Sequence, residues 1–142
     1  MKPVAESSCP CGTARSYAEC CGLFLSGQAI APNAEALMRS RYTAFTKRDE
    51  AYLLATWHPS TRPAALNLAG DTATKWIGLD VKSVEATGAD SAIVEFVARY
   101  KLGGRAQRLH EVSRFVRAQG YWYYVCAVTS TPAPSPPPVR IP

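Results

Sequence analysis

The sequence predicts an α+β fold in which helices precede an antiparallel sheet. Two observations carry this prediction. Apolar residues recur at helical spacing in the first part of the chain, and from Trp76 onward they alternate with polar residues. Short glycine-containing turns separate the alternating segments, which is typical of consecutive antiparallel strands. Because the helices come first and the strands follow, we expect the helices to cover one face of a curved sheet.

Two helices are expected before the sheet, one over residues 34–47 and one from Asp49 to about residue 56. Asn33 and Asp49 are good N-caps, since their side-chain oxygens can accept hydrogen bonds from backbone N–H groups of the first turn. A third, short helix is expected over residues 64–69, where the composition is compatible with one and a glycine follows.

Four strands are expected after the helices, with turns between them. They cover residues 76–86, 92–102, 105–117 and 121–128. A two-residue hairpin loop at Gly103-Gly104 would fix the register of the middle pair, because Leu102 would then face Arg105 and Glu95 would face Val112.

Four of the five cysteines lie within thirteen residues, in a segment rich in glycine and proline. Such a segment cannot bury enough side chain to hold one shape, so it needs a cross-link. Four thiolates in two close pairs, Cys9 with Cys11 and Cys20 with Cys21, match a closed structural zinc site, which we favour. A redox cluster and disulfides are the alternatives. Disulfides require an oxidising compartment, whereas the first residues carry no apolar run typical of an export signal.

Composition predicts a cytoplasmic protein without membrane association. The chain has 142 residues, of which 47% are hydrophobic and 19% charged, and no apolar run approaches the roughly 18 residues of a membrane helix.

The chain divides into four regions. We expect a flexible N-terminus over residues 1–8, a cysteine knuckle over 9–25 and an α+β domain over 33–128. Residues 131–142 contain six prolines and should form a disordered tail.

A polar group on the predicted sheet is the candidate pocket. The register places Glu95 near His110 and Arg114. If helices cover that face, the group is buried, and it is either an acid–base pair oriented by Arg114 or a buried salt bridge. Arg41 and His58 complete the candidate pocket. His58 stands in a proline-bounded loop, where a hydrogen-bonding role is favoured over that of a base.

The cysteine segment resembles a known zinc-binding module. Cys-Pro-Cys-Gly at residues 9–12 and Cys-Cys-Gly at residues 20–22 are similar to the SEC-C motif, found at the end of the preprotein translocase motor and in many bacterial proteins. The resemblance implies structural zinc. It places the ligands at Cys9, Cys11, Cys20 and Cys21.

A wider resemblance covers residues 9 to about 126. Four further blocks, at residues 36–44, 57–63, 95–100 and 110–115, look like the signature blocks of the YchJ-like bacterial family and come in that family's order. The resemblance implies a fold like that of nuclear transport factor 2, in which helices and a curved antiparallel sheet form a cone. It implies no established activity.

We therefore expect a small zinc-binding protein whose metal is structural and whose knuckle docks a protein partner. The first alternative is an enzyme or small-ligand binder that uses the cone, although fold analogy alone fixes no reaction. The second alternative is association with the ribosome or nucleic acid through arginines. The net charge of +5 admits it, but the basic residues are spread along the chain, which favours a solvated surface over such a partner.

Overall fold

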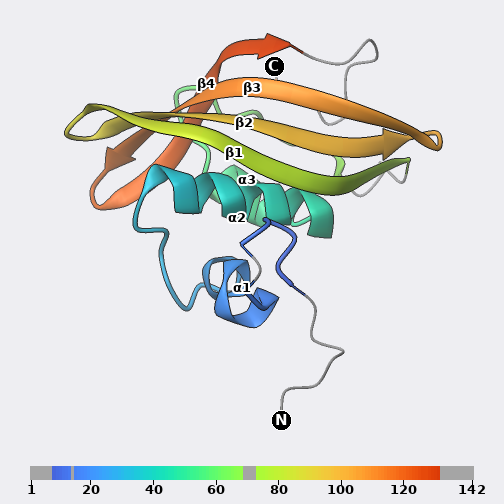
Figure 1. The fold of residues 1–142 in the computed structure, drawn as a ribbon. Helices are drawn as coiled ribbons and strands as arrows, with labels where there is room; N and C mark the ends of the chain where they lie inside the picture. The colour runs from blue at the N-terminus through green and yellow to red at the C-terminus, as the bar shows by residue number, and fades with distance from the viewer. Residues whose placement is uncertain (1–7, 14, 69–72, 132–142) are drawn as a thin grey trace.

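A computed structural model of the protein describes residues 8–13, 15–68 and 73–131. Figure 1 shows helices on one face of a curved four-stranded antiparallel sheet, so the α+β prediction is confirmed. The predicted flexible N-terminus and proline-rich tail fall almost entirely outside the described residues. In chain order the elements are η1 (Tyr17–Glu19), α1 (Cys21–Leu25), α2 (Ala34–Lys47), α3 (Glu50–Ala55), β1 (Thr74–Gly88), β2 (Ser91–Leu102), β3 (Arg105–Ala118) and β4 (Tyr121–Thr131).

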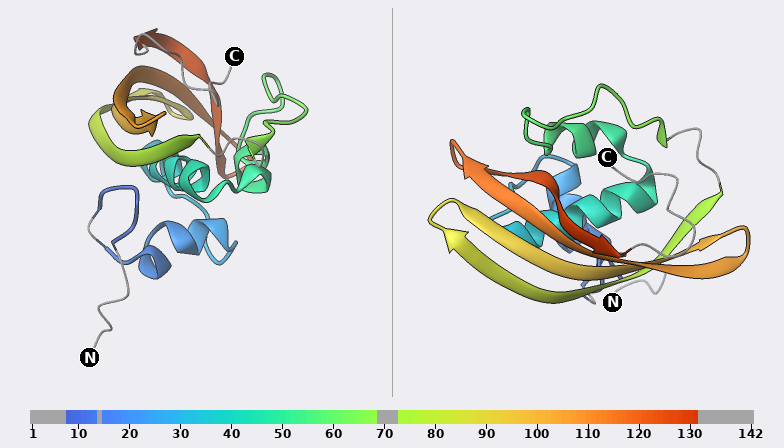
Figure 2. Two further views of the ribbon diagram at one scale, coloured as in Figure 1. Left: turned by 90° about the vertical axis from the view of Figure 1, so that its right-hand side faces the viewer. Right: turned by 90° about the horizontal axis from the view of Figure 1, so that it is seen from above.

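The sheet is a meander in which every strand pairs with its neighbour in sequence, in the order β1-β2-β3-β4. The predicted register of the central pair is confirmed, since Leu102 lies opposite Arg105 and Glu95 opposite Val112. Register shifts interrupt the β1–β2 and β3–β4 ladders, and such bulges increase the local twist and bend of strands. Figure 2 shows the sheet curving over α2 and α3.

Both predicted helix caps form. The Oδ1 atom of Asn33 accepts a hydrogen bond from the Ala36 N–H at 2.8 Å, and that of Asp49 accepts one from the Tyr52 N–H at 3.1 Å. Each cap satisfies a backbone donor that has no partner within the helix. Helix α2 ends at Arg48, whose φ of 55° stops the helical backbone.

The helix predicted over residues 64–69 is wrong. Residues 64–67 are not helical, and residue 69 lies outside the described residues. The carboxylate of Glu50 on α3 accepts hydrogen bonds from the backbone N–H groups of Leu66 and Leu68, at 3.0 and 3.1 Å. Asn67 between them has a left-handed φ of 59°. The carboxylate of Glu50, from another element, therefore binds this segment in a non-helical conformation.

The core lies between the inner face of the sheet and the helices. Trp57 is buried and packs edge-on against Tyr124 of β4, with ring centroids 5.0 Å apart. Buried side chains of α2 and of the sheet belong to the same cluster; they include Leu37, Met38, Tyr42, Val94, Phe96 and Phe115. Within the described residues, the model has no helix with the length and apolar character needed to cross a bilayer.

Candidate metal centre and polar sites

Two short turns bring the cysteines together. In the first, the Cys9 N–H donates to the Arg15 carbonyl at 2.6 Å and the Gly12 N–H donates to the Cys9 carbonyl at 3.2 Å. Gly12 has a φ of 91°, a conformation that a residue with a Cβ rarely adopts. In the second turn, the Cys20 N–H donates to the Tyr17 carbonyl at 3.1 Å, and α1 begins at the next residue.

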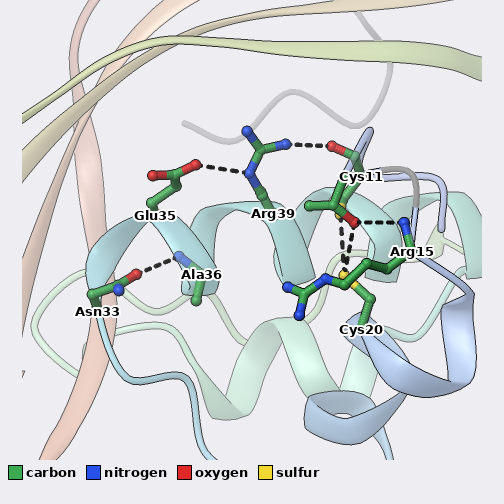
Figure 3. A network of polar contacts seen from close by, with 8 residues as sticks. Cys11, Arg15, Cys20, Asn33, Glu35, Ala36 and Arg39 are labelled. Atoms are coloured by element: carbon green, nitrogen blue, oxygen red, sulfur yellow. Dashed lines mark hydrogen bonds and ion pairs between the residues drawn. The ribbon is translucent and has the colours of Figure 1, made fainter.

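The four predicted ligands converge as one cluster. Their sulfur atoms all lie within 4.8 Å of one another, and the Sγ atoms of Cys11 and Cys20 are 3.5 Å apart (Figure 3). A tetrahedral site with Zn–S bonds of ~2.3 Å places its sulfurs roughly 3.8 Å apart. All four cysteines are free thiols and at most 5% exposed. The donor set, its spacing and its burial therefore fit a metal ion in a closed site.

Two threonine hydroxyls lie beside the sulfur cluster. Thr13 Oγ1 lies 3.2 Å from Cys20 Sγ and 3.6 Å from Cys11 Sγ, and Thr43 Oγ1 of α2 lies 3.7 Å from Cys9 Sγ. Hydrogen bonds to sulfur disperse the negative charge of thiolates, so these hydroxyls suit a cluster that must carry several charges.

The cysteine side chains also interact with one another through hydrogen bonds, which shift their pKa values. The hydrogen bond with Cys11, and then that with Cys21, lowers the pKa of Cys9. For Cys21, the hydrogen bond with Cys11, and then that with Cys9, raises the pKa. The thiols of the cluster therefore lose their protons in coupled steps and not independently. A metal that binds all four sulfurs must displace the remaining protons, which makes its affinity depend on pH.

The knuckle is attached to both α2 and the sheet. Arg39 of α2 donates from Nη1 to the Cys11 carbonyl at 2.6 Å, and its Nε donates to Glu35 at 3.0 Å (Figure 3). A Cβ added at Gly12 would lie 3.2 Å from the Leu79 carbonyl of β1, so the backbones are close. The cysteines thus belong to the same buried cluster as the core of the larger domain.

The pair expected on the sheet forms, but on the outer face. His110 Nε2 donates to Glu95 Oε2 at 2.6 Å, and Ser83 donates to Glu95 Oε1 at 3.2 Å. The helices cover the opposite face, so the His110 and Glu95 side chains remain 35% and 37% exposed. Arg114 is exposed on this same outer face. The expected burial of the pair is therefore not found.

Arg41 lies on the other side of the sheet. Its Nη1 donates to the Leu53 carbonyl at 2.8 Å and to Thr56 Oγ1 at 2.7 Å, and its guanidinium lies over the Trp57 and Tyr124 rings. The side chain is 5% exposed, and this burial lowers the pKa of Arg41 to about 10. Its hydrogen bonds and ring contacts hold the loop after α3 against β4.

His58 has the hydrogen-bonding role expected from the sequence. Its Nδ1 accepts from the Ser60 N–H at 3.1 Å, and its ring meets Tyr123 edge-on. Its backbone N–H donates to the Tyr124 carbonyl at 2.8 Å, which ties the loop to β4. The structure therefore does not gather the five candidate residues into one pocket.

The sequence leaves open whether Glu111 faces solvent or pairs with Ser113, and the structure shows the pairing, on the inner face. Glu111 is 7% exposed and accepts a hydrogen bond from the buried Ser113 hydroxyl at 2.7 Å. The signal in the sequence is the alternation of side chains along a strand. Glu111 lies an even number of residues from the apolar Leu109 and Phe115, so the three side chains share one face of β3. Its negative charge also raises the pKa of Arg41, although less than burial lowers it.

One described cavity, of about 170 Å³, lies beside the start of β1. None of the five candidate residues contributes to it. The residues that line it are Phe45, Thr46, Arg48, Leu68, Thr74, Lys75 and Trp76.

Comparisons with known proteins agree with this architecture. Residues 33–127 match the family described as YchJ, middle NTF2-like domain. A UPF0225 protein of Xanthomonas campestris pv. campestris is 57% identical over 129 residues, which cover 89% of this chain and 99% of the relative. A UPF0225 protein of Chromobacterium violaceum is 54% identical over 133 residues, covering 91% and 98%.

Two solved structures share the fold, and both are SEC-C motif containing proteins. The one from Rhodopseudomonas palustris has a TM-score of 0.77 and 33% identity, and the match covers 89% of this chain and 98% of that one. The one from Psychrobacter arcticus has a TM-score of 0.72 and 29% identity, with 87% and 83% covered. Both resemblances noted in the sequence, to the SEC-C motif and to the YchJ-like proteins, are confirmed.

Proposed function

The chain belongs to the YchJ-like UPF0225 family, and on that premise we propose that it is a small zinc-binding protein whose metal is structural. The observation that carries the proposal is the convergence of four buried cysteine sulfurs within 4.8 Å. Catalytic zinc sites keep an open position for water or substrate, whereas four thiolates fill a tetrahedron. The fold shared with two SEC-C motif containing proteins supports the same assignment.

Bound zinc would cross-link the two turns of the knuckle and contribute folding free energy directly. The ligands would be Cys9, Cys11, Cys20 and Cys21. The chain's own groups prepare the site, because Arg39 fixes the Cys11 carbonyl while Thr13 and Thr43 face the sulfurs. We keep the cytoplasmic location within this proposal, because free thiols persist in a reducing compartment.

The second part of the proposal is that the knuckle docks a protein partner. Ile30, in the connector between α1 and α2, is 57% exposed and offers an apolar anchor. Arg15 and Glu19 are exposed on the knuckle itself and offer charged contacts to the same partner. An apolar centre with a charged rim is the usual composition of a protein–protein interface.

Metal analysis and amide exchange test the structural role of zinc. The purified protein should contain one zinc per chain, and a chelator should raise amide exchange in residues 8–25 before it does so in β2 and β3. Cys20→Ser should abolish zinc binding, while Cys126→Ser, which removes the thiol outside the cluster, should leave it intact. A metal-free protein whose knuckle amides are equally protected would end the proposal.

The docking role has its own test. An Ile30→Ser variant should keep its zinc and its melting temperature but lose co-purifying partners. A Val128→Ser variant, which removes another exposed apolar side chain from β4, serves as the matched control. Equal partner recovery with both variants would contradict docking through the knuckle.

A small-ligand or enzymatic role is the second candidate, and one observation favours it. The short His110–Glu95 hydrogen bond, supported by Ser83, is the arrangement of an oriented acid–base pair. A ligand that uses this pair should raise the melting temperature of the wild type and not that of His110→Ala. If His110→Ala only lowers stability, the pair is structural.

A further inference from the structure

The end of the sheet at the β2–β3 turn carries cations that face one another. In the ladders, Lys75 lies directly opposite Lys101, and Arg99 lies directly opposite Arg108. All four are exposed, and we call them the hairpin patch.

This arrangement is unfavourable for the sheet alone, because like charges directly opposite each other on neighbouring strands destabilise the pairing. Arg99 is partly compensated, since its Nη1 lies 2.7 Å from Asp80. For the other three cations, the described part of the chain shows no ion pair.

The rest of the outer face differs in its charge balance. In the middle of the sheet, Glu95 accepts a hydrogen bond from His110. Glu85 lies on β1 two residues beyond Ser83, the residue opposite Glu95. At the opposite end, Arg117 pairs with Asp90 at 2.9 Å. Among the described residues, cations that face each other directly across neighbouring strands lie at the hairpin end.

The outer face at the hairpin end is also accessible. Figures 1 and 2 show the β2–β3 turn projecting past the end of α2, and the outer face turned away from the helices and knuckle. A long, extended ligand can therefore lie across three strands without meeting another element of the fold.

We propose that the hairpin patch binds the phosphate backbone of single-stranded RNA. The Cα atoms of facing cationic residues lie about 5 Å apart across strands, and those of alternate residues lie about 6.6 Å apart along one strand. Such a regular array suits an extended polymer with one negative charge per nucleotide. Exposed Ile77 on β1 supplies apolar surface beside the patch for a base. Lysine and arginine contacts to phosphate carry no sequence information, so the binding should be independent of base sequence.

The proposal goes beyond the zinc assignment and does not depend on it, because the patch faces away from the knuckle. Fluorescence anisotropy of the full zinc-loaded chain with a labelled oligouridylate of about 16 nucleotides tests it. Wild-type affinity should fall steeply as salt rises, since bound phosphates release counterions.

A pair of double variants locates the site. Lys101→Ser with Arg108→Ser should weaken binding roughly tenfold or more and reduce the slope of log affinity against log salt by about 1.4, since each single-strand contact contributes ~0.7. Lys82→Ser with Arg114→Ser removes the same charge from the middle of the same face. It should change affinity less than about threefold.

The melting temperature separates binding from folding. The hairpin double variant should melt at or above the wild-type temperature, because it removes facing like charges. Equal loss of affinity in both double variants would overturn the patch as the site, as would binding that is indifferent to salt. Failure to bind RNA at low salt, or tighter binding to anionic phosphatidylserine vesicles than to RNA, would overturn RNA as the partner.

Discussion

The knuckle and the sheet are stabilised by different means, although they share one buried cluster. In the knuckle, η1 and α1 span only three and five residues, and the four sulfurs form its centre. In the sheet, long strands pair through backbone ladders and have a hydrophobic inner face.

The contrast shows where a metal is needed. A chain segment that lacks both a ladder and a long helix must obtain its order from cross-links, because ordering each residue costs conformational entropy. A four-stranded meander covers that cost through burial and hydrogen bonds. Helix α2 contacts both regions.

The strongest test of this contrast removes one sulfur. Cys11→Ala should reduce the free energy of unfolding by about 4–5 kcal/mol, because loss of a structural metal belongs to the largest class of effects. Zinc content should vanish and amide protection should be lost first in residues 8–25. Cys126→Ala is the control. If the β2–β3 amides exchange as early as those of the knuckle, the two regions are one cooperative unit.

The converse test weakens the sheet. Phe115 is buried and packs against Tyr124, with ring centroids 5.8 Å apart. Phe115→Ala should cost about 3–5 kcal/mol in urea unfolding through lost burial and a cavity, while the folded protein keeps its zinc. Val116→Ala, next to it on the outer face, should cost much less. Loss of zinc from folded Phe115→Ala would contradict the separation.

Two glycines with left-handed backbones sharpen the comparison further. Gly12 of the knuckle and Gly104 of the hairpin turn both have positive φ, but an added Cβ meets the Leu79 carbonyl only at Gly12. Gly104→Ala should therefore cost ~1 kcal/mol from backbone strain alone. Gly12→Ala should cost about 2–3 kcal/mol and weaken zinc retention. Equal effects would mean that the knuckle is free to move away from β1.

Of these tests, lowering the pH should change the stability of the protein least. The hydrogen bond from His110, and then that from Ser83, lowers the pKa of Glu95 below its ordinary value of 4.5. Its stabilising contribution is therefore present above about pH 4.5 and is lost as pH falls through the lowered pKa. Glu95→Gln should flatten the acid limb of stability measured by urea unfolding, while Glu85→Gln should not. An unchanged acid limb in Glu95→Gln would show that the pair contributes nothing to stability.

Local signals in the sequence were sufficient for much of the fold. The caps at Asn33 and Asp49 and the turn at Gly103-Gly104 act within a few residues, so the helix starts and the β2–β3 register could be predicted. The cysteine site was equally predictable, because its spacing and residue types already define the donor set.

The face of the sheet that the helices cover could not be predicted. Both faces of β2 and β3 mix polar with apolar side chains, so alternation alone did not separate Glu95 and His110 from Glu111 and Ser113. The loop after α3 failed for a related reason, since its conformation depends on the Glu50 carboxylate from another element. Both errors concern contacts distant in sequence.

The close approach of Gly12 to Leu79 has a consequence for biosynthesis. During translation the cysteines leave the ribosome well before β1, yet their enclosure requires the backbone of that strand. Until β1 has been made, the nascent thiols are open to oxidants and to competing metals. The interval between synthesis of the cysteines and synthesis of β1 is thus the period in which incorrect metallation or oxidation of the chain can occur.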